Sequence, residues 1–229
     1  SKLNLARNGV VGATAFHHVE FTCGDATTTC RQFMNSLGLE IAAKSDLSMG
    51  NTAFCSHLGK SDEVQFLFTA PSNAENPTAI TSVQPFPHYS AKKANAHATK
   101  HGLSVCAVAV RVDSVPMAFE YMVRNGGIPI LPPTVVHDRD PARGWCDMAE
   151  VKLYGDVCLR LINTDNFKGS FLPNFHDVVG RGSKLGKYGI GRIDHVVGNV
   201  HSLQDTLKYI KTITVRLHVL SINQILYLY

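Results

Sequence analysis

The chain has 229 residues, of which 45% are hydrophobic and 17% charged, and its formal net charge is +4. This composition is typical of a globular protein with one large domain or two small ones, and it excludes a disordered chain. Basic residues form no run, and no apolar stretch reaches the roughly 20 residues of a membrane span, so we expect no nucleic-acid or membrane partner.

The first predicted unit opens with a strand, Phe16–Phe21, in which polar and apolar residues alternate. Asp25 can cap the helix that follows, and Gly38 can end it. Two strands and a polar helix complete this part of the chain, at Thr52–Leu58, Val64–Thr69 and Ser90–Lys100. The predicted order is therefore a strand, a helix and further strands, with a second helix leading onward.

The second predicted unit repeats this order. Its first strand, Val105–Val112, is an apolar and β-branched run of the kind found in buried strands. Ser114 can cap the next helix, which has Pro116 in its first turn. Two further strands, Asp147–Tyr154 and Asp156–Ile162, are separated by Gly155 and predict a hairpin.

A third unit begins with the predicted strand Ile193–Val197, which carries His195, and Ser202 can cap a helix after it. The three helix starts, at Asp25, Ser114 and Ser202, are about 88 residues apart, which indicates a structural repeat. The first two units can cover each other's apolar faces. The third has no partner within the 229 residues, so we expect it to bury too little surface to be stable alone.

Three other patterns resemble functional sites. Adjacent His17 and His18 could suggest a metal cluster, but neighbouring residues of a regular strand point to opposite faces, so we expect no shared ion. His218 follows His195 by far less than one repeat and is not expected to be a second ligand. The Gly/Lys-rich residues 180–187 do not match the phosphate-loop pattern, which favours a linker at 180–191.

Six short motifs occur in the order found in one enzyme family. They are F-H-H-V-E-F (16–21), G-D-A-T (24–27), K-S-D-L-S (44–48), Q-F-L-F-T-A-P (65–71), A-E-V-K-L-Y-G-D-V (149–157) and D-H-V-V-G-N-V (194–200). From residue 16 to 210 the chain resembles plant-type 4-hydroxyphenylpyruvate dioxygenase, of the vicinal-oxygen-chelate superfamily.

The resemblance implies an α+β, glyoxalase-like fold of paired βαβββ modules. It predicts a complete N-terminal domain of two modules at 16–165, the linker at 180–191, and the start of a C-terminal catalytic domain at 192–212. Residues 213–229 match no family motif and form a divergent apolar tail, for which a splice or read-through origin is one hypothesis that the sequence does not decide. By this reading the chain is truncated within the catalytic domain.

The same resemblance implies a non-haem Fe(II) enzyme that converts 4-hydroxyphenylpyruvate and O₂ into homogentisate and CO₂, a step of tyrosine and phenylalanine catabolism that also supplies plastoquinone and tocopherol precursors in plants. The family holds iron with two His and one Glu. His195 matches the first ligand, and Val197 matches a residue of the substrate pocket. The second His and the Glu have no counterpart here, so no catalytic set is complete, and we expect this chain to bind no iron and to be inactive alone.

Two alternative functions stay open. The chain could be a non-catalytic partner of full-length subunits, or a 4-hydroxymandelate synthase, which shares the substrate and the iron site. The family resemblance also implies a homo-oligomer. Six cysteines without a C-x-x-C pair favour reduced thiols in a cytoplasmic protein, with a chloroplast location possible if a targeting segment precedes these residues.

Overall fold

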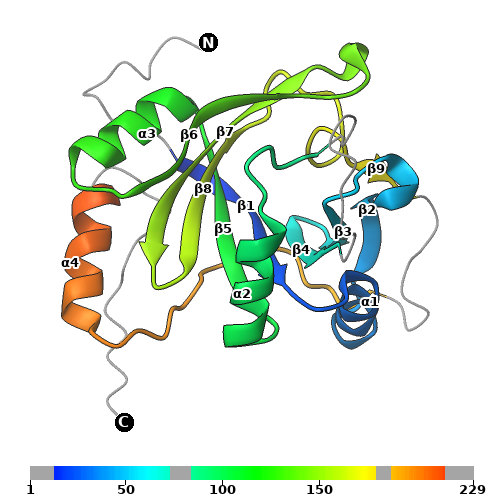
Figure 1. Cartoon of the computed structure of the whole chain (residues 1–229), viewed down its shortest axis with the longest axis horizontal. Helices are drawn as coiled ribbons and strands as arrows, with labels where there is room; N and C mark the ends of the chain where they lie inside the picture. Colours follow the sequence, from blue (N-terminus) through cyan, green and yellow to red (C-terminus); the bar gives the residue numbers. More distant parts are fainter. Residues whose placement is uncertain (1–12, 73–83, 179–186, 215–229) are drawn as a thin grey trace.

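The computed structural model describes residues 13–72, 84–178 and 187–214. The strands of the first two ranges form one sheet in the order β6-β7-β8-β5-β1-β4-β3-β2-β9 (Figure 1). The first module consists of β1 (Ala13–Thr22), α1 (Ala26–Leu37), β2 (Glu40–Ser45), β3 (Phe54–Ser61) and β4 (Val64–Pro71). The second consists of β5 (Ser104–Val112), α3 (Val115–Arg124), β6 (Pro129–His137), β7 (Trp145–Tyr154) and β8 (Val157–Asn163). The remaining elements are the 3₁₀ turns η1 (Leu47–Met49) and η2 (Pro141–Arg143), helices α2 (Ala91–His101) and α4 (Leu203–Thr214), and the short strand β9 (His176–Asp177).

Both modules follow the order βαβββ, so the predicted α+β fold of paired modules is confirmed. Their first strands meet at the centre of the sheet, where β1 runs antiparallel to β5. On its other side β1 lies parallel to β4, and β5 likewise lies parallel to β8. Side chains from both modules are therefore brought together along β1 and β5.

The predicted helix starts are confirmed by their caps. The side chain of Asp25 accepts hydrogen bonds from two backbone N–H groups of α1, and Gly38 ends that helix with a φ of 66°. The side chain of Ser114 caps α3, and Pro116 lies in its first turn. Three strands were not predicted: β2, β6 and β9. The sequence of β6 contains three prolines, which a strand tolerates only where its N–H groups face away from the sheet, and β6 is an edge strand.

The sheet buries apolar side chains on both faces. On β5, Val108 and Val110 pack in a cluster with the helix α3, whereas Ala109 between them belongs to a cluster on the opposite face. That opposite cluster contains the aromatic residues Phe54, Phe86, Phe171 and Phe175. A third cluster lies beneath α1. The face opposite the two helices is thus filled by side chains, and the polar cluster described below lies on it.

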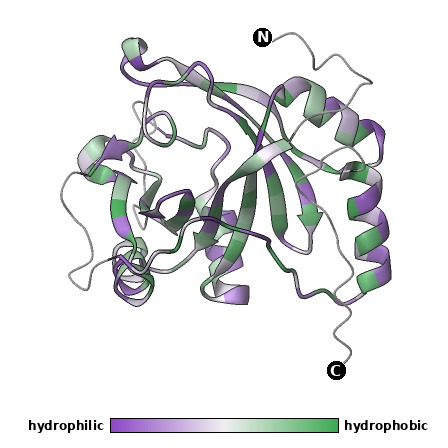
Figure 2. Cartoon of the chain, turned by 180° about the vertical axis from the view of Figure 1, so that it is seen from behind, coloured by the Kyte–Doolittle hydropathy of each residue, from purple (hydrophilic) through white to green (hydrophobic). Residues whose placement is uncertain are grey.

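The predicted third strand is not formed. Residues 187–202 contain neither helix nor strand, although α4 begins after Ser202 as predicted. Between the described residues, no backbone hydrogen bond is donated by residues 192–200, and a strand needs such a partner. Figure 2 shows this segment crossing the back of the molecule as a single chain that leads to α4.

Contrary to expectation, helix α4 of the predicted third unit packs against the second module. Ile213 of α4 is fully buried in the cluster beneath α3, and the Tyr209 hydroxyl donates a 2.8 Å hydrogen bond to the Lys152 carbonyl. Helix α4 continues to Thr214, beyond the predicted boundary at 212. Residues 180–186 of the predicted linker and 215–229 of the predicted tail, with His218, lie outside the described residues. Within the described part, no helix is long and apolar enough to cross a membrane.

Candidate functional site

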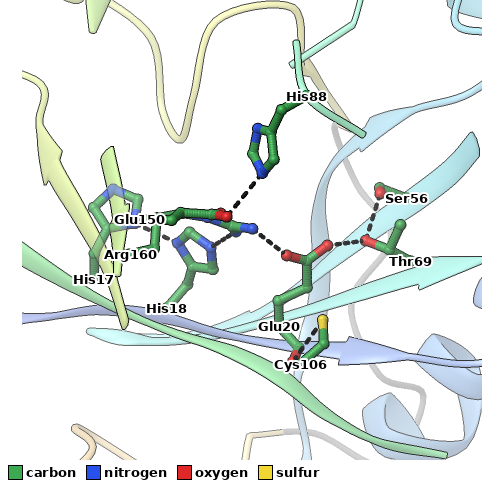
Figure 3. A network of polar contacts seen from close by, with 9 residues as sticks. All are labelled: His17, His18, Glu20, Ser56, Thr69, His88, Cys106, Glu150 and Arg160. Atoms are coloured by element: carbon green, nitrogen blue, oxygen red, sulfur yellow. Dashed lines mark hydrogen bonds and ion pairs between the residues drawn. The ribbon is translucent and has the colours of Figure 1, made fainter. Parts of the chain in front are cut away.

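Arg160 on β8 is the centre of a buried polar cluster (Figure 3). Its Nη2 lies 2.7 Å from Oε2 of Glu20, and its Nε donates to Oε1 of Glu150 over 2.7 Å. Its Nη1 lies 3.0 Å from Nε2 of His18. None of these four residues is more than 4% exposed. The guanidinium carbon also lies 4.3 Å from the centre of the Phe86 ring, so the cation has partners around its edge and on its face.

The strand register explains why these side chains meet. His18 of β1 pairs with Ala109 of β5, Ala109 pairs with Arg160 of β8, and Arg160 pairs with Glu150 of β7. The four residues therefore form one row across four strands. Because Ala109 has only a methyl group, the long side chain of Arg160 can extend over it toward His18. Glu20 lies two residues further along β1 and points to the same face.

A second set of contacts holds the carboxylates in place. Oε1 of Glu20 accepts a 2.6 Å hydrogen bond from the Thr69 hydroxyl, which is itself 2.7 Å from the hydroxyl of Ser56. Oε2 of Glu150 lies 2.8 Å from Nε2 of His88, whose side chain is 28% exposed. The cluster thus links strands of both modules, which favours a role in holding the two halves together.

The electrostatics keep Glu150 charged and His18 neutral. Burial alone would raise the pKa of Glu150, but Arg160 and then His88 outweigh it and lower the pKa to about 2. Burial would likewise lower the pKa of Arg160, but Glu20 and Glu150 raise it well above its usual value. Burial, followed by the neighbouring charges, lowers the pKa of His18 well below its ordinary value.

The expectation that His17 and His18 point to opposite faces of the sheet is wrong. The pairing of β1 with β5 shifts register between Phe16 and His18, so β1 has a β-bulge at this point. The bulge brings both buried rings to the same side, with their Nδ1 atoms 2.7 Å apart. Because Arg160 can only donate, His18 accepts at Nε2 and carries its proton at Nδ1, which donates to Nδ1 of His17. Burial and then nearby Arg111 lower the pKa of His17 to about 3.

His195 and Val197 lie on the surface. The His195 side chain is 64% exposed, and Val197 is 78% exposed. Nδ1 of His195 lies 3.0 Å from the carboxylate of Asp194, a contact that lowers the pKa of Asp194. Adjacent residues of a regular strand could not make this contact, so it is specific to the irregular conformation of this segment. The predicted roles of both residues stay predictions.

The described residues do not fit an iron ion by themselves. An Fe(II) site of this type needs two imidazoles and a carboxylate on one face of the metal. Within the described ranges, no three His, Cys, Asp or Glu side chains are grouped so as to hold a metal ion. His195 offers one imidazole, and the buried cluster is occupied by a guanidinium.

Comparisons with known proteins agree with the sequence motifs. The chain is 44% identical over 200 residues to the 4-hydroxyphenylpyruvate dioxygenase of Daucus carota and 45% identical over 202 residues to that of Plectranthus scutellarioides. Over these residues the chain is similar to the plant 4-hydroxyphenylpyruvate dioxygenases. Each match covers 87% of this chain but 44% of the relative, so the chain spans less than half the length of these dioxygenases. No family model matches the chain.

Solved structures support the fold. A triple mutant of 4-hydroxymandelate synthase from Streptomyces coelicolor aligns with a TM-score of 0.64 and 18% identity, over 88% of this chain and 52% of that one. A fusion of a xylose isomerase-like TIM barrel with a 4-hydroxyphenylpyruvate dioxygenase aligns with a TM-score of 0.60 and 16% identity, over 89% of this chain and 28% of that one. At these identities the similarity establishes the fold alone and does not distinguish the two activities.

The sequence reasoning missed the centre of the buried cluster. Arg160 stands in the run V-C-L-R-L-I and Glu150 in M-A-E-V, and both runs were recognised as strands. A charged residue inside an otherwise apolar strand is a signal of a buried ion pair, because such a residue is almost never buried without a partner. The same signal applies to Glu20 in F-H-H-V-E-F.

Proposed function

We propose that this chain is part of a 4-hydroxyphenylpyruvate dioxygenase, an Fe(II) enzyme that converts 4-hydroxyphenylpyruvate and O₂ into homogentisate and CO₂ in tyrosine catabolism. The observation that carries the proposal is the identity of 42–45% to plant enzymes of this name over 87% of the chain. In this proposal His195 is one iron ligand, and Val197 lines the substrate pocket.

The two parts of the chain then have different tasks. The described residues between 13 and 163 form a scaffold in which Arg160 is buried between two carboxylates, and we expect this scaffold to fold without a metal. Residues 187–214 supply His195. Fe(II) supplies the oxygen chemistry when it is bound, but it needs two further donors besides this imidazole. We therefore expect the 229-residue chain alone to produce no homogentisate.

A chimera tests the proposal. Residues 1–210 are joined to the part of the Daucus carota enzyme that follows its aligned segment, and homogentisate is measured after addition of Fe(II), ascorbate and substrate. The chimera is expected to be active, and H195A to reduce its activity at least about 100-fold, because even residues that only support a metal ligand contribute up to that factor. His201 is exposed and lies six residues on, so H201A is the matched control and is expected to stay active.

Two results would contradict the proposal. One is a folded chimera that makes no homogentisate although the intact Daucus carota enzyme does so under the same conditions. The other is an H195A chimera as active as its H201A control. Homo-oligomerisation and a cytoplasmic location are further parts of the proposal. They are tested by sedimentation of the chimera and by localisation of a tagged chain in plant cells.

A further inference from the structure

The last described part of the chain is attached to a different module at each of its ends. Figure 2 shows it crossing the back of the molecule from the first module to the second, where it leads into α4. We propose that residues 192–214 form a strap that opens as one unit about Gly191 while both modules stay folded, and that the Tyr209 hydroxyl is its latch. The strap does not depend on the proposed activity.

Gly191 is the pivot because the first module holds the backbone up to this residue. The Ser61 hydroxyl donates a 2.7 Å hydrogen bond to the Ile190 carbonyl. The Glu63 N–H donates a 2.9 Å hydrogen bond to the Gly191 carbonyl. Between the described residues, none of the N–H groups of 192–200 donates a backbone hydrogen bond, so a rotation after Gly191 breaks no ladder. Hinges are loop residues that absorb large changes of φ and ψ, and glycine does so at the lowest steric cost.

The Tyr209 hydroxyl holds the far end of the strap by bridging two backbone groups of the second module. The Lys152 N–H donates to the Ile128 carbonyl over 2.8 Å, as in an antiparallel ladder. The hydroxyl takes the place of the reciprocal bond, because it accepts from the Ile128 N–H over 3.3 Å and donates to the Lys152 carbonyl over 2.8 Å. When the hydroxyl leaves, these two backbone groups can bond to each other. The second module therefore keeps its own hydrogen bonds when the strap opens.

Few side chains of the strap are buried against the second module. Val196 packs against the apolar cluster beneath α3. Gly198 lies so close to the ring of Tyr154 that a Cβ at this position would be 2.5 Å from Cζ of the ring. Within α4 the buried residues are Ile213 and Thr214. The free energy of opening should therefore be smaller than that of unfolding the modules, whose strands bury apolar side chains along their whole length.

The closed and open positions of the strap differ in what residues 192–200 can do. In the closed position their backbone lies against the second module, although the side chains of His195 and Val197 are exposed. Opening separates this backbone from the module. Residues 192–200 are then free to pair as the strand that their alternation of apolar and polar residues predicts.

Native-state hydrogen exchange of the full 229-residue chain, in urea below the unfolding transition, tests the strap. The hydrogen-bonded amide protons of α4 are expected to exchange faster than those of β5, and with a smaller dependence on urea, because a local opening exposes less surface than global unfolding. Y209F is expected to speed the exchange of α4 about fivefold, the factor that corresponds to one hydrogen bond, and to leave β5 unchanged. Y188F is the matched control, because the Tyr188 hydroxyl donates to the Asn35 carbonyl on the first-module side of the pivot.

The same measurement contains the results that would overturn the proposal. If the amide protons of α4 exchange at the rate and with the urea dependence of those of β5, α4 leaves only when the whole chain unfolds. If they show no protection in the natural chain, there is no closed position. Equal exchange of α4 in Y209F and Y188F would show that the Tyr209 hydroxyl is not the latch. A Y209F chain that does not fold, or in which β5 is accelerated as much as α4, would show that this hydroxyl stabilises the whole fold instead.

Discussion

Arg160→Met removes the buried cation while it keeps much of the volume of the side chain. Glu20 and Glu150 are then left in the interior without their guanidinium partner. The pKa of Glu150 in the folded chain, about 2 against an ordinary 4.5, corresponds to about 3 kcal/mol of stabilisation at neutral pH. Breaking a buried ion pair typically costs about 3–5 kcal/mol. We therefore expect R160M to lose about 3–5 kcal/mol, which lowers Tm by roughly 6–20 °C for a chain of this size.

The sign of the pH dependence provides a sharper check. A carboxyl whose pKa is lowered by folding stabilises the protein above its unfolded pKa of 4.5, and this stabilisation is lost as the pH falls through about 2. In R160M the cation is gone, so burial raises the pKa of Glu150 and the carboxyl becomes neutral at a higher pH. The stability difference between the natural chain and R160M should therefore be largest at pH 7 and shrink as the solution is acidified.

The assay is urea unfolding followed by circular dichroism at pH 7 and pH 4. Arg111→Met makes the same chemical change at an exposed position and is expected to cost less than about 0.5 kcal/mol. The double variant E150Q/R160M should be more stable than R160M, because it removes one of the stranded charges. A deficit below about 1 kcal/mol at pH 7, or one that does not change with pH, would refute this reasoning.

Three further predictions concern other parts of the chain. His17 has a pKa of about 3 in the folded chain and 6.5 in the unfolded chain, so the stability of the fold should decrease as the pH drops from 6.5 towards 3. The decrease should be less steep in H17Q, and equal slopes of Tm against pH in the two chains would contradict this prediction. Tyr209→Phe removes the hydrogen bond to the Lys152 carbonyl, so trypsin should cleave within α4 faster than in the control variant Tyr188→Phe. Equal cleavage rates would show that this hydrogen bond does not hold α4 in place. The backbone amide protons of residues 192–200 should exchange fast in this chain and slowly in the chimera, where the predicted strand can pair with a neighbour. Slow exchange of these protons in the chain alone would contradict the unpaired conformation.

Local signals were sufficient for most of the first two modules. Asp25, Ser114 and Gly38 are residues whose own chemistry fixes a helix end, and the structure places them at those ends. The spacing of the caps also predicted the repeat. Strand β6 was missed because its prolines argue against a strand, and only its position at the edge of the sheet permits them.

The features that were predicted wrongly or missed depend on contacts between distant residues. The bulge that brings His17 and His18 together is a property of the pairing between β1 and β5, and no local pattern marks it. The partners of Arg160 follow from the register of four strands. The strand predicted around His195 has the right alternation, but a strand also needs a neighbour to accept its hydrogen bonds, and none of the described residues provides one.

The central proposal is that this chain, which is similar to plant 4-hydroxyphenylpyruvate dioxygenases, contributes one iron ligand, His195, beside two folded modules that we expect to bind no iron. Anaerobic equilibration with Fe(II), followed by desalting and iron analysis, tests the claim most directly. We predict no retained iron for the 229-residue chain, and one iron per chimera that is lost in H195A. Stoichiometric iron retained by the 229-residue chain, dependent on His195 and two of its other side chains, would contradict the account.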